Sequence, residues 1–318
     1  MCLLPQFQGI LYFHWVKTNY IRTDQSHKVE QNSLKKIKLI ECPRDAMQGW
    51  KNFIPTATKV EYINSLLKVG FDTLDFTSFV SAKAIPQMAD AKDVVTRIDL
   101  TNSKTKLLAI VANVRGAQDA AVYDSINYLG FPFSISPTFQ MRNTNSTIED
   151  SFETVKQLQE ICVKAGKELV VYISMAFGNP YGDKYDKDIV VEWINKLTPL
   201  GIKIISLADT VGVATAQQVS DLTSYVIKML PDYEIGIHLH STSFNRKEKL
   251  EAALDAGCYR IDGALKGIGG CPMANDDLVG NMDMEWIVNY LESKNITTGI
   301  DKDALQKSLV LADKVFSN

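Results

Sequence analysis

The sequence lacks several features that would place it in a common class of protein. No apolar run approaches the roughly 20 residues that a membrane-spanning helix needs, so no membrane partner is expected. The five cysteines are irregularly spaced and form no CxxC pair, which disfavours a disulfide framework or a structural zinc module and favours a reducing, cytoplasmic compartment. The 34 basic and 37 acidic residues are interspersed, so there is no basic field for nucleic acid. The class of function that these absences leave is chemistry on a small molecule.

Residues 1–35 lack the marks of a targeting segment. Their apolar stretch has no basic start and no small-residue cleavage site, and Pro5, Gly9 and His14 interrupt it. We therefore expect an N-terminal extension that is flexible or packs at an edge. Residues 36–318 form the expected folded domain and are enough to bury a large core.

A repeating pattern fills the rest of the chain: a short β-branched run, a turn or loop, and an amphipathic helical stretch. No G-x-G-x-x-G follows the first run, which disfavours a doubly wound open sheet. Eight alternating units in about 250 residues are typical of a single closed (β/α)8 TIM barrel, an α/β fold. A last helical stretch, 301–316, is expected to cap the barrel or pack on a partner. The expected strands are 37–41, 73–80, 106–113, 128–136, 168–176, 202–210, 234–240 and 259–267.

Histidine is scarce, and two of the four, His238 and His240, stand two residues apart in the expected seventh strand. Side chains at i and i+2 of a strand point the same way. Two neutral imidazoles on one face are half of a site for a divalent cation. The pair alone leaves open a core histidine beside a surface one.

Charged residues follow or interrupt other expected strands, and the C-terminal ends of barrel strands carry the chemistry of such folds. Arg44 and Asp45 follow the first strand, where a carboxylate can join two imidazoles around Mg²⁺ or Mn²⁺ and a guanidinium can hold an enolate oxygen; a surface ion pair is the alternative. Asp75 interrupts an apolar strand, so it must be paired or functional. Asp209 follows the sixth strand, where a helix N-cap is the alternative.

A glycine-rich loop, G-I-G-G-C-P (267–272), follows the eighth strand and carries Cys271. Such a loop can move and can approach a ligand closely, so it favours a chemical role for the thiol over a structural one. Asn281 lies ten residues further on. Its amide oxygen could complete the metal site, or the residue could cap the next helix.

Together these stretches resemble the 3-hydroxy-3-methylglutaryl-CoA lyase family over residues 37–291. The cysteine loop and T-S-F-V-S-x-K are specific to that family, whereas R-D and H-x-H are shared with related synthases and aldolases. The matching stretches are P-R-D-x-x-Q (43–48), T-S-F-V-S-x-K-x-x-P-Q-M-A-D (77–90), S-L-x-D-T-x-G-V (206–213), H-x-H (238–240) and G-x-G-G-C-P-x-A with a following G-N (267–281).

The resemblance implies a divalent-metal-dependent enzyme that splits 3-hydroxy-3-methylglutaryl-CoA, or a similar 3-hydroxyacyl-CoA, into acetyl-CoA and acetoacetate. It also implies a homodimer. The implied metal ligands are Asp45, His238, His240 and Asn281. The implied catalytic residues are Arg44 at the enolate, His238 as base, Cys271 in proton transfer and Asp209 in support of substrate positioning. Substrate contacts are expected from Asp75, Gln48, Ser78 and Lys83.

The chain departs from this family at positions that bear on specificity. Where the family usually has glycine before the Pro-Arg-Asp and again after it, this chain has Cys42 and Ala46. Ser241 replaces an aspartate, Val170 an arginine and Asp75 a glutamate.

Three alternatives stay open. A Claisen-type acyl-CoA synthase would use the same metal, but it would resemble G-E-R-A-G-N at the cysteine loop. A 4-hydroxy-2-oxo acid aldolase gives no reason for the thiol. A barrel that binds metal or acyl-CoA without catalysis, as a scaffold, gives no reason for Arg44 and the full ligand set.

Overall fold

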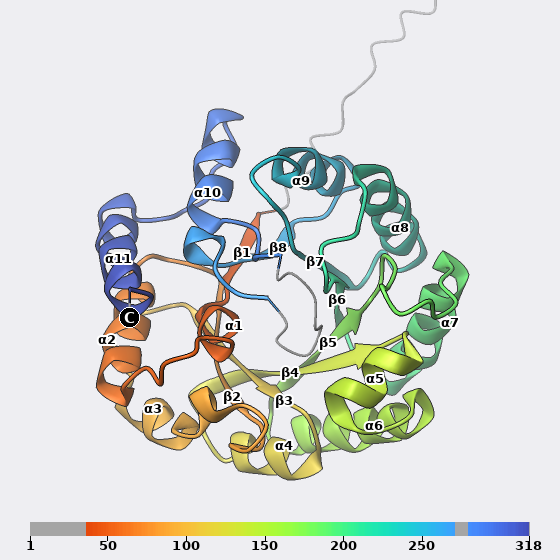
Figure 1. Ribbon diagram of the computed structural model, residues 1–318, viewed down its shortest axis with the longest axis horizontal. Helices are drawn as coiled ribbons and strands as arrows, with labels where there is room; N and C mark the ends of the chain where they lie inside the picture. Colours follow the sequence, from red (N-terminus) through yellow and green to blue (C-terminus); the bar gives the residue numbers. More distant parts are fainter. Residues whose placement is uncertain (1–35, 271–278, 318) are drawn as a thin grey trace, which may run out of the picture. The chain divides into compact units, whose positions relative to one another are not determined.

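The computed structural model describes residues 36–270 and 279–317 and shows a ring of strands enclosed by helices (Figure 1). Eight parallel strands pair in chain order and the last pairs with the first, so the predicted TIM barrel is confirmed. Helices on the outside bury the second face of each strand, which explains the nearly continuous apolar runs. The strands are β1 Lys38–Glu41, β2 Thr73–Phe79, β3 Lys106–Val111, β4 Ile126–Ser134, β5 Glu168–Ser174, β6 Ile204–Asp209, β7 Glu234–Leu239 and β8 Arg260–Gly263.

Several helices begin at capping residues and end at glycines that the sequence places there. α8 begins at a capping box between Thr215 and Gln218. The glycines that close the helical stretches adopt the expected left-handed conformation, with φ of 93° at Gly70, 65° at Gly166 and 87° at Gly257. The helices are α1 Pro43–Gln48, α2 Thr56–Leu66, α3 Ala91–Arg97, α4 Val114–Ala121, α5 Pro137–Thr144, α6 Ile148–Lys164, α7 Lys187–Leu197, α8 Ala216–Met229, α9 Arg246–Asp255, α10 Met284–Ser293 and α11 Lys302–Val315, with 3-10 turns η1 Pro86–Met88, η2 Thr198–Leu200 and η3 Leu265–Gly267.

The last helix, α11, lies in the outer layer beside α2 (Figure 1). The ring of Phe316 meets those of Trp50 and Tyr62 edge-on, and the hydroxyls of Ser65 and Ser308 are 2.9 Å apart. α11 therefore covers the barrel's first α/β unit from outside.

The expected strand boundaries were wrong by a few residues, most of all at the eighth strand. That strand stops at Gly263, because its ladder with β1 has no partner beyond Glu41. The chain then turns into η3, where Lys266 adopts a positive φ of 63°. The fourth and fifth strands likewise end two residues early, at Ser134 and Ser174.

The barrel interior is apolar on one side and charged on the other. An apolar cluster fills the β3–β6 side: Leu108, Ile110, Tyr128, Val170, Tyr172 and Ile204. On the β7–β8–β1 side, Glu234 accepts from Lys38 Nζ at 2.5 Å and from Arg260 Nη1 at 2.9 Å. Charged groups there have partners, as burial requires.

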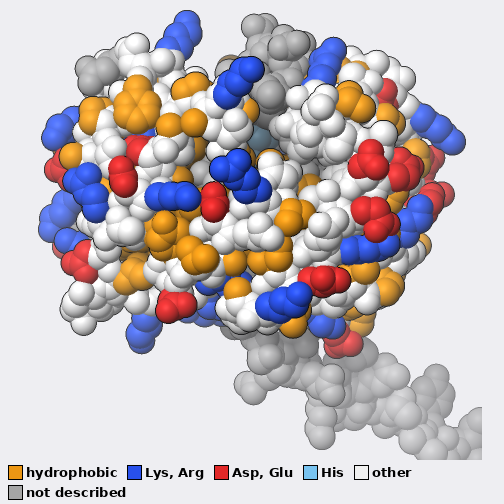
Figure 2. Space-filling view, turned by 90° about the horizontal axis from the view of Figure 1, so that it is seen from below, with side chains coloured by type: hydrophobic (Ala, Val, Ile, Leu, Met, Phe, Trp, Pro, Cys, Tyr) orange, Lys and Arg blue, Asp and Glu red, His pale blue; other side chains and the backbone are white. Residues whose placement is uncertain are grey.

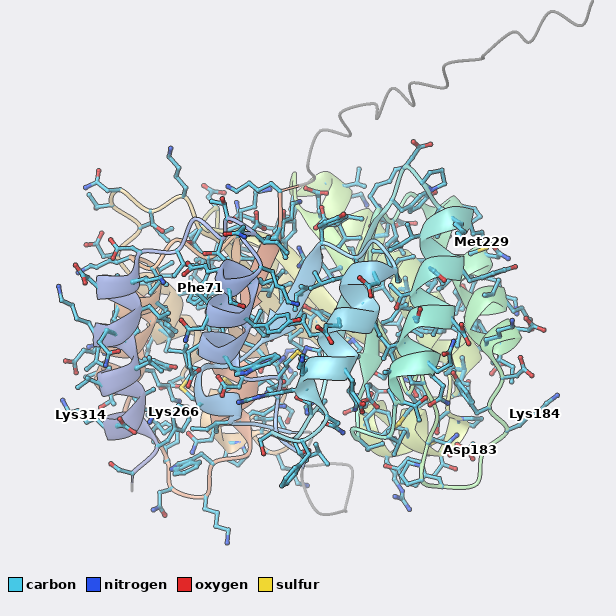
Figure 3. All side chains as sticks on the ribbon, turned by 90° about the horizontal axis from the view of Figure 1, so that it is seen from above. Phe71, Asp183, Lys184, Met229, Lys266 and Lys314 are labelled. Atoms are coloured by element: carbon cyan, nitrogen blue, oxygen red, sulfur yellow. The ribbon has the colours of Figure 1, made fainter. Side chains whose placement is uncertain are left out.

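The C-terminal ends of the strands share one end of the barrel. In Figure 3, Asp183 and Lys266, which follow β5 and β8, lie at one end, whereas Phe71 and Met229, which precede β2 and β7, lie toward the other. In such barrels the end that follows the strands carries the active site.

The outer surface mixes charges of both signs. On the face shown in Figure 2, basic and acidic side chains are interspersed among apolar ones. Among the described helices, none combines the length and the apolar character that crossing a membrane requires.

A tight approach between β2 and α4 gives a test of the fold. A Cβ at Gly116 would lie 2.2 Å from the backbone oxygen of Phe79, so Gly116→Ala must push the helix from the sheet. We expect a loss of about 1–3 kcal/mol in the free energy of unfolding, measured by urea denaturation. Gly49→Ala is the matched control, because its nearest neighbour would be 4.0 Å away and its φ is −90°. Equal midpoints for the two variants would contradict this packing.

Candidate metal centre and substrate pocket

A cavity of about 410 Å³ opens among the C-terminal ends of the strands. Arg44 and Asp45 of α1, His238 of β7 and His240 directly after β7 line it. Ile110, Pro132 and Phe139 contribute apolar surface, and Arg142 of α5 contributes a second cation. A cavity that combines apolar surface with a few charged groups suits a small-molecule ligand.

His238 of β7 and His240, directly after that strand, have adjacent rings, as their spacing predicts, with ring centroids 5.2 Å apart. His240 Nδ1 lies 2.9 Å from the carbonyl oxygen of Val279, which can only accept, so Nδ1 carries the proton. His238 Nδ1 lies 3.2 Å from Asp262 Oδ2 and donates likewise. In its neutral form each ring therefore keeps the lone pair on Nε2, the atom available to an ion.

Asp45 completes a group of three ligands. One carboxylate oxygen of Asp45 and one nitrogen from each of His238 and His240 lie within 4.8 Å of one another. Burial alone would raise the pKa of Asp45, but Arg44 and the two histidines lower it to about 2. The carboxylate is therefore charged at neutral pH, as a metal ligand must be.

Asn281 lies beside Asp45 although 236 residues separate them in the chain. Its Nδ2 donates to Asp45 Oδ2 at 2.6 Å and to the Ile268 carbonyl at 2.9 Å, while its buried Oδ1 has no hydrogen-bond partner among the described residues. Gly269 makes the approach possible, because a Cβ there would lie 2.3 Å from Asn281 Nδ2. The four predicted ligands thus converge, and two imidazoles, a carboxylate and an unpaired amide oxygen fit a divalent cation.

Arg44 and Asp75 form a buried ion pair. Arg44 Nη2 lies 2.5 Å from Asp75 Oδ2, and Nη1 lies 3.0 Å from Asp45 Oδ1. Burial alone would lower the pKa of Arg44, but the two carboxylates raise that pKa by more than burial lowers it, so the guanidinium stays charged. Asp75 has the partner that its buried position required, and Arg44 stands between it and the cavity, which Arg44 lines and Asp75 does not.

Asp209 lies behind the cavity wall. Its Oδ2 accepts from Lys249 Nζ at 2.7 Å and its Oδ1 from the backbone N–H of Ala214 at 3.0 Å. Lys249 also donates to the His240 carbonyl at 2.9 Å. Asp209 therefore joins the loop after β6 to the end of β7, and its oxygens have partners within the protein.

The other predicted site residues divide into three groups. Gln48 and Ser78 line the cavity, and Gln48 Nε2 donates to Asp45 Oδ1 at 2.8 Å. Lys83 is exposed and does not line the cavity, although its neighbours Ala84 and Ile85 do. Cys271 lies outside the described residues.

Sequence reasoning missed Asp262 and Lys249. Asp262 pairs with His238 in the β7–β8 ladder, and the i, i+2 spacing of Arg260 and Asp262 was the available signal. Lys249 lies in α9 and gives no local signal, because its partners come from two other segments.

The comparisons with known proteins agree with this geometry. A family model described as HMGL-like matches residues 36–311. The chain is 32% identical over 266 residues to the cytoplasmic 3-hydroxy-3-methylglutaryl-CoA lyase of Danio rerio, covering 83% of this chain and 78% of that one. It is 33% identical over 276 residues to the hydroxymethylglutaryl-CoA lyase YngG of Bacillus subtilis, covering 85% and 90%. A mitochondrial enzyme of Mus musculus is 32% identical over 280 residues, covering 88% and 84%.

Solved structures give the same result. An HMG-CoA lyase from A. baumannii in complex with coenzyme A and 3-methylmalate superposes with a TM-score of 0.83 at 31% identity, covering 89% of this chain and 92% of that one. The Bacillus subtilis HMG-CoA lyase also gives a TM-score of 0.83, with 31% identity and coverage of 89% and 95%. Both the family model and these relatives extend over most of the barrel, and the chain therefore belongs to the HMGL-like family.

Proposed function

We propose that this protein is a divalent-metal-dependent carbon–carbon lyase that cleaves 3-hydroxy-3-methylglutaryl-CoA to acetyl-CoA and acetoacetate. The observation that carries the proposal is the convergence of ligand atoms from Asp45, His238 and His240 in one cavity beside Arg44, with the side chain of Asn281 hydrogen-bonded to Asp45. The named relatives act on this substrate or bind coenzyme A. Mg²⁺ or Mn²⁺ is the proposed ion, because carboxylate and amide oxygens are hard ligands.

The reaction breaks one carbon–carbon bond. The tertiary hydroxyl of the substrate loses its proton, its carbon becomes the ketone of acetoacetate, and the bonding electron pair passes to the thioester as an enolate. Protonation of the enolate carbon gives acetyl-CoA. A bound cation supplies Lewis acidity at the substrate's oxygens.

Arg44 is the group that we assign to the enolate. Asp75 holds its Nε and Nη2, and Asp45 holds Nη1, so the guanidinium is fixed before substrate arrives. A preorganised cation in a site shielded from water stabilises developing negative charge more than a mobile one.

The two roles predicted for His238 compete for one atom. With Nδ1 bonded to Asp262, Nε2 alone has a free lone pair, and it can hold an ion or accept a proton but not both. We assign ligation as the primary role, because His240 and Asp45 present ligand atoms within 4.8 Å of a ring nitrogen of His238. As a base, His238 would first have to release the ion.

The remaining assignments are also proposals. Gln48 and Ser78 contact substrate from the cavity wall, Lys83 contacts the outer part of the CoA from the exposed rim, and Asp209 positions His240 through Lys249. Cys271 transfers a proton. We further propose a cytoplasmic homodimer; the named relatives include cytoplasmic and mitochondrial enzymes.

Removal of the metal should abolish turnover. We expect acetyl-CoA release from 3-hydroxy-3-methylglutaryl-CoA with Mg²⁺ or Mn²⁺, loss of activity in excess chelator and recovery when the ion is restored. The free acid without CoA should not react. Undiminished turnover in chelator would contradict the metal-dependent mechanism, and failure to cleave any hydroxyacyl thioester despite bound metal would favour the non-catalytic scaffold.

Removal of the Arg44 guanidinium should lower kcat on the order of 100-fold or more, because an oxyanion stabiliser is lost. Arg44→Met alone leaves Asp75 buried without its cation, so the informative variant is Arg44→Met with Asp75→Asn. Arg142→Met is the matched control: this arginine lines the same cavity but is exposed, and its loss should act mainly on KM. A double variant with the parent kcat would refute the role of Arg44.

Cys271→Ala should lower kcat by about 100-fold or more without changing metal affinity, because a proton-transfer group is removed. Cys162→Ala is the control, since that thiol is buried in α6, away from the cavity. An unchanged rate in Cys271→Ala would exclude the thiol from proton transfer.

A further inference from the structure

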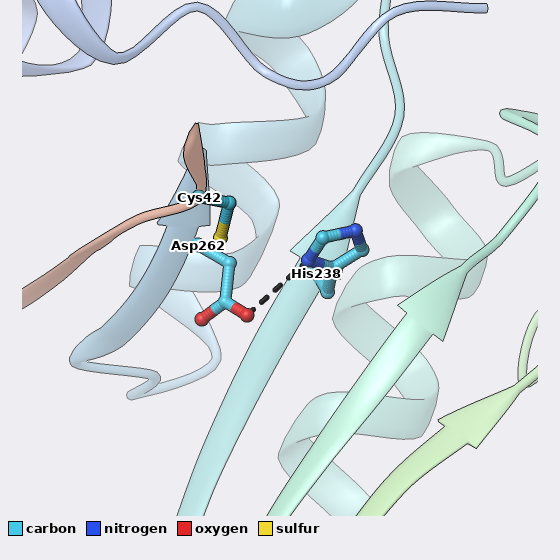
Figure 4. Close-up of side chains that lie close together, drawn as sticks. All are labelled: Cys42, His238 and Asp262. Carbon is cyan, nitrogen blue, oxygen red and sulfur yellow. Dashed lines mark hydrogen bonds and ion pairs between the residues drawn. The ribbon is translucent and has the colours of Figure 1, made fainter. Parts of the chain in front are cut away.

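A second carboxylate, that of Asp262, contacts the ring of His238 and does not line the cavity. Figure 4 shows Asp262 of β8 bonded to His238 Nδ1, with Cys42 beside them. The side chain of Asp262 is wholly buried, while that of His238 is 12% exposed. The two residues are register partners on neighbouring strands, so the backbone ladder itself fixes their approach.

We propose that Asp262, which is not a metal ligand, is the positioning residue that fixes the ring of His238 and thereby sets the affinity of the ion site. By holding the proton on Nδ1, Asp262 leaves the lone pair on Nε2 and prevents the ring from turning. Carboxylates in this relation to a ligating histidine typically contribute 10–100-fold in metal affinity. The inference rests on the proposed function in so far as His238 binds the ion.

A buried cation supports the charge of Asp262. Arg260 precedes it by two residues on the same face of β8, and its side chain is 1% exposed. Burial alone would lower the pKa of Arg260, but Asp262, more than any other neighbour, raises it. Gly236 makes room for this arginine, because a Cβ there would lie 2.9 Å from Arg260 Cδ. Asp262 therefore lies near a buried cation, and its Oδ2 bonds the imidazole of His238.

Cys42 offers a matched control at the same place. Its Sγ lies within 4.8 Å of the ring nitrogen of His238 and the carboxylate of Asp262. The thiol donates to the Ile40 carbonyl at 3.7 Å, and burial together with nearby carboxylates raises its pKa, so it stays neutral. It shares the surroundings of Asp262 but has no charge to hold the ring.

The first measurement needs no metal. In chelator-treated protein labelled with ¹⁵N-histidine and held at alkaline pH, where the ring is neutral, the side-chain shifts of His238 should report a proton on Nδ1 and a lone pair on Nε2, and Asp262→Asn should remove that preference. The chain has four histidines, so His240→Gln and His238→Gln assign the signals. A wild-type ring protonated on Nε2 alone would overturn the inference even if no variant folds.

The second measurement is Mn²⁺ affinity by calorimetry. Asp262→Asn should weaken Mn²⁺ binding 10–100-fold with an unchanged thermal midpoint, whereas Cys42→Ser should bind within twofold of wild type. Wild-type Mn²⁺ affinity in Asp262→Asn would overturn the positioning role. An equal loss of affinity in Cys42→Ser would overturn it too, because packing or sulfur ligation would then explain the effect. If wild type binds no Mn²⁺, the proposed function fails, and the ¹⁵N shifts still decide the role of Asp262.

Discussion

The closure of a parallel sheet is the constraint on which this structure depends. Because every strand runs the same way, all carboxyl ends meet at one end of the ring, and residues far apart in the chain become neighbours. For this reason Asn281 Nδ2 lies 2.6 Å from Asp45 Oδ2, although 236 residues separate them in the chain. No single segment of the chain contains the site; the barrel gathers it from its first, seventh and eighth units.

Bringing these residues together buries charged side chains, and several of them form buried ion pairs. Arg44 stands between Asp45 and Asp75, Lys249 meets Asp209, and Arg260 bonds Glu234. Buried ion pairs are poor stabilisers compared with apolar packing of the same volume, because desolvation offsets much of their attraction. The β3–β6 side of the interior uses apolar packing instead. The charges are concentrated on the side where His238 and Asp45 stand, which points to chemistry as the reason for keeping them.

The geometry of the candidate metal site does not by itself separate a lyase from a synthase or an aldolase, because the R-D and H-x-H motifs that supply Asp45, His238 and His240 resemble those of all three. The features that favour a lyase over a synthase or an aldolase are the sequence motifs of the cysteine loop and T-S-F-V-S-x-K, together with the lyases that align over most of the chain.

The sequence alone predicted the barrel and its eight units, because strand periodicity is a local signal, and the ends of its strands indicated the proposed metal ligands. His238 and His240 share a face by spacing, and Asp45 follows the first strand by position. What it could not determine were relations across the ring: that Arg44 is the partner of Asp75, that Asp209 faces Lys249 and not the cavity, and that Asp262 holds His238. Those depend on the register between strands and on helices packing over them, and such distances are fixed only when the sheet closes.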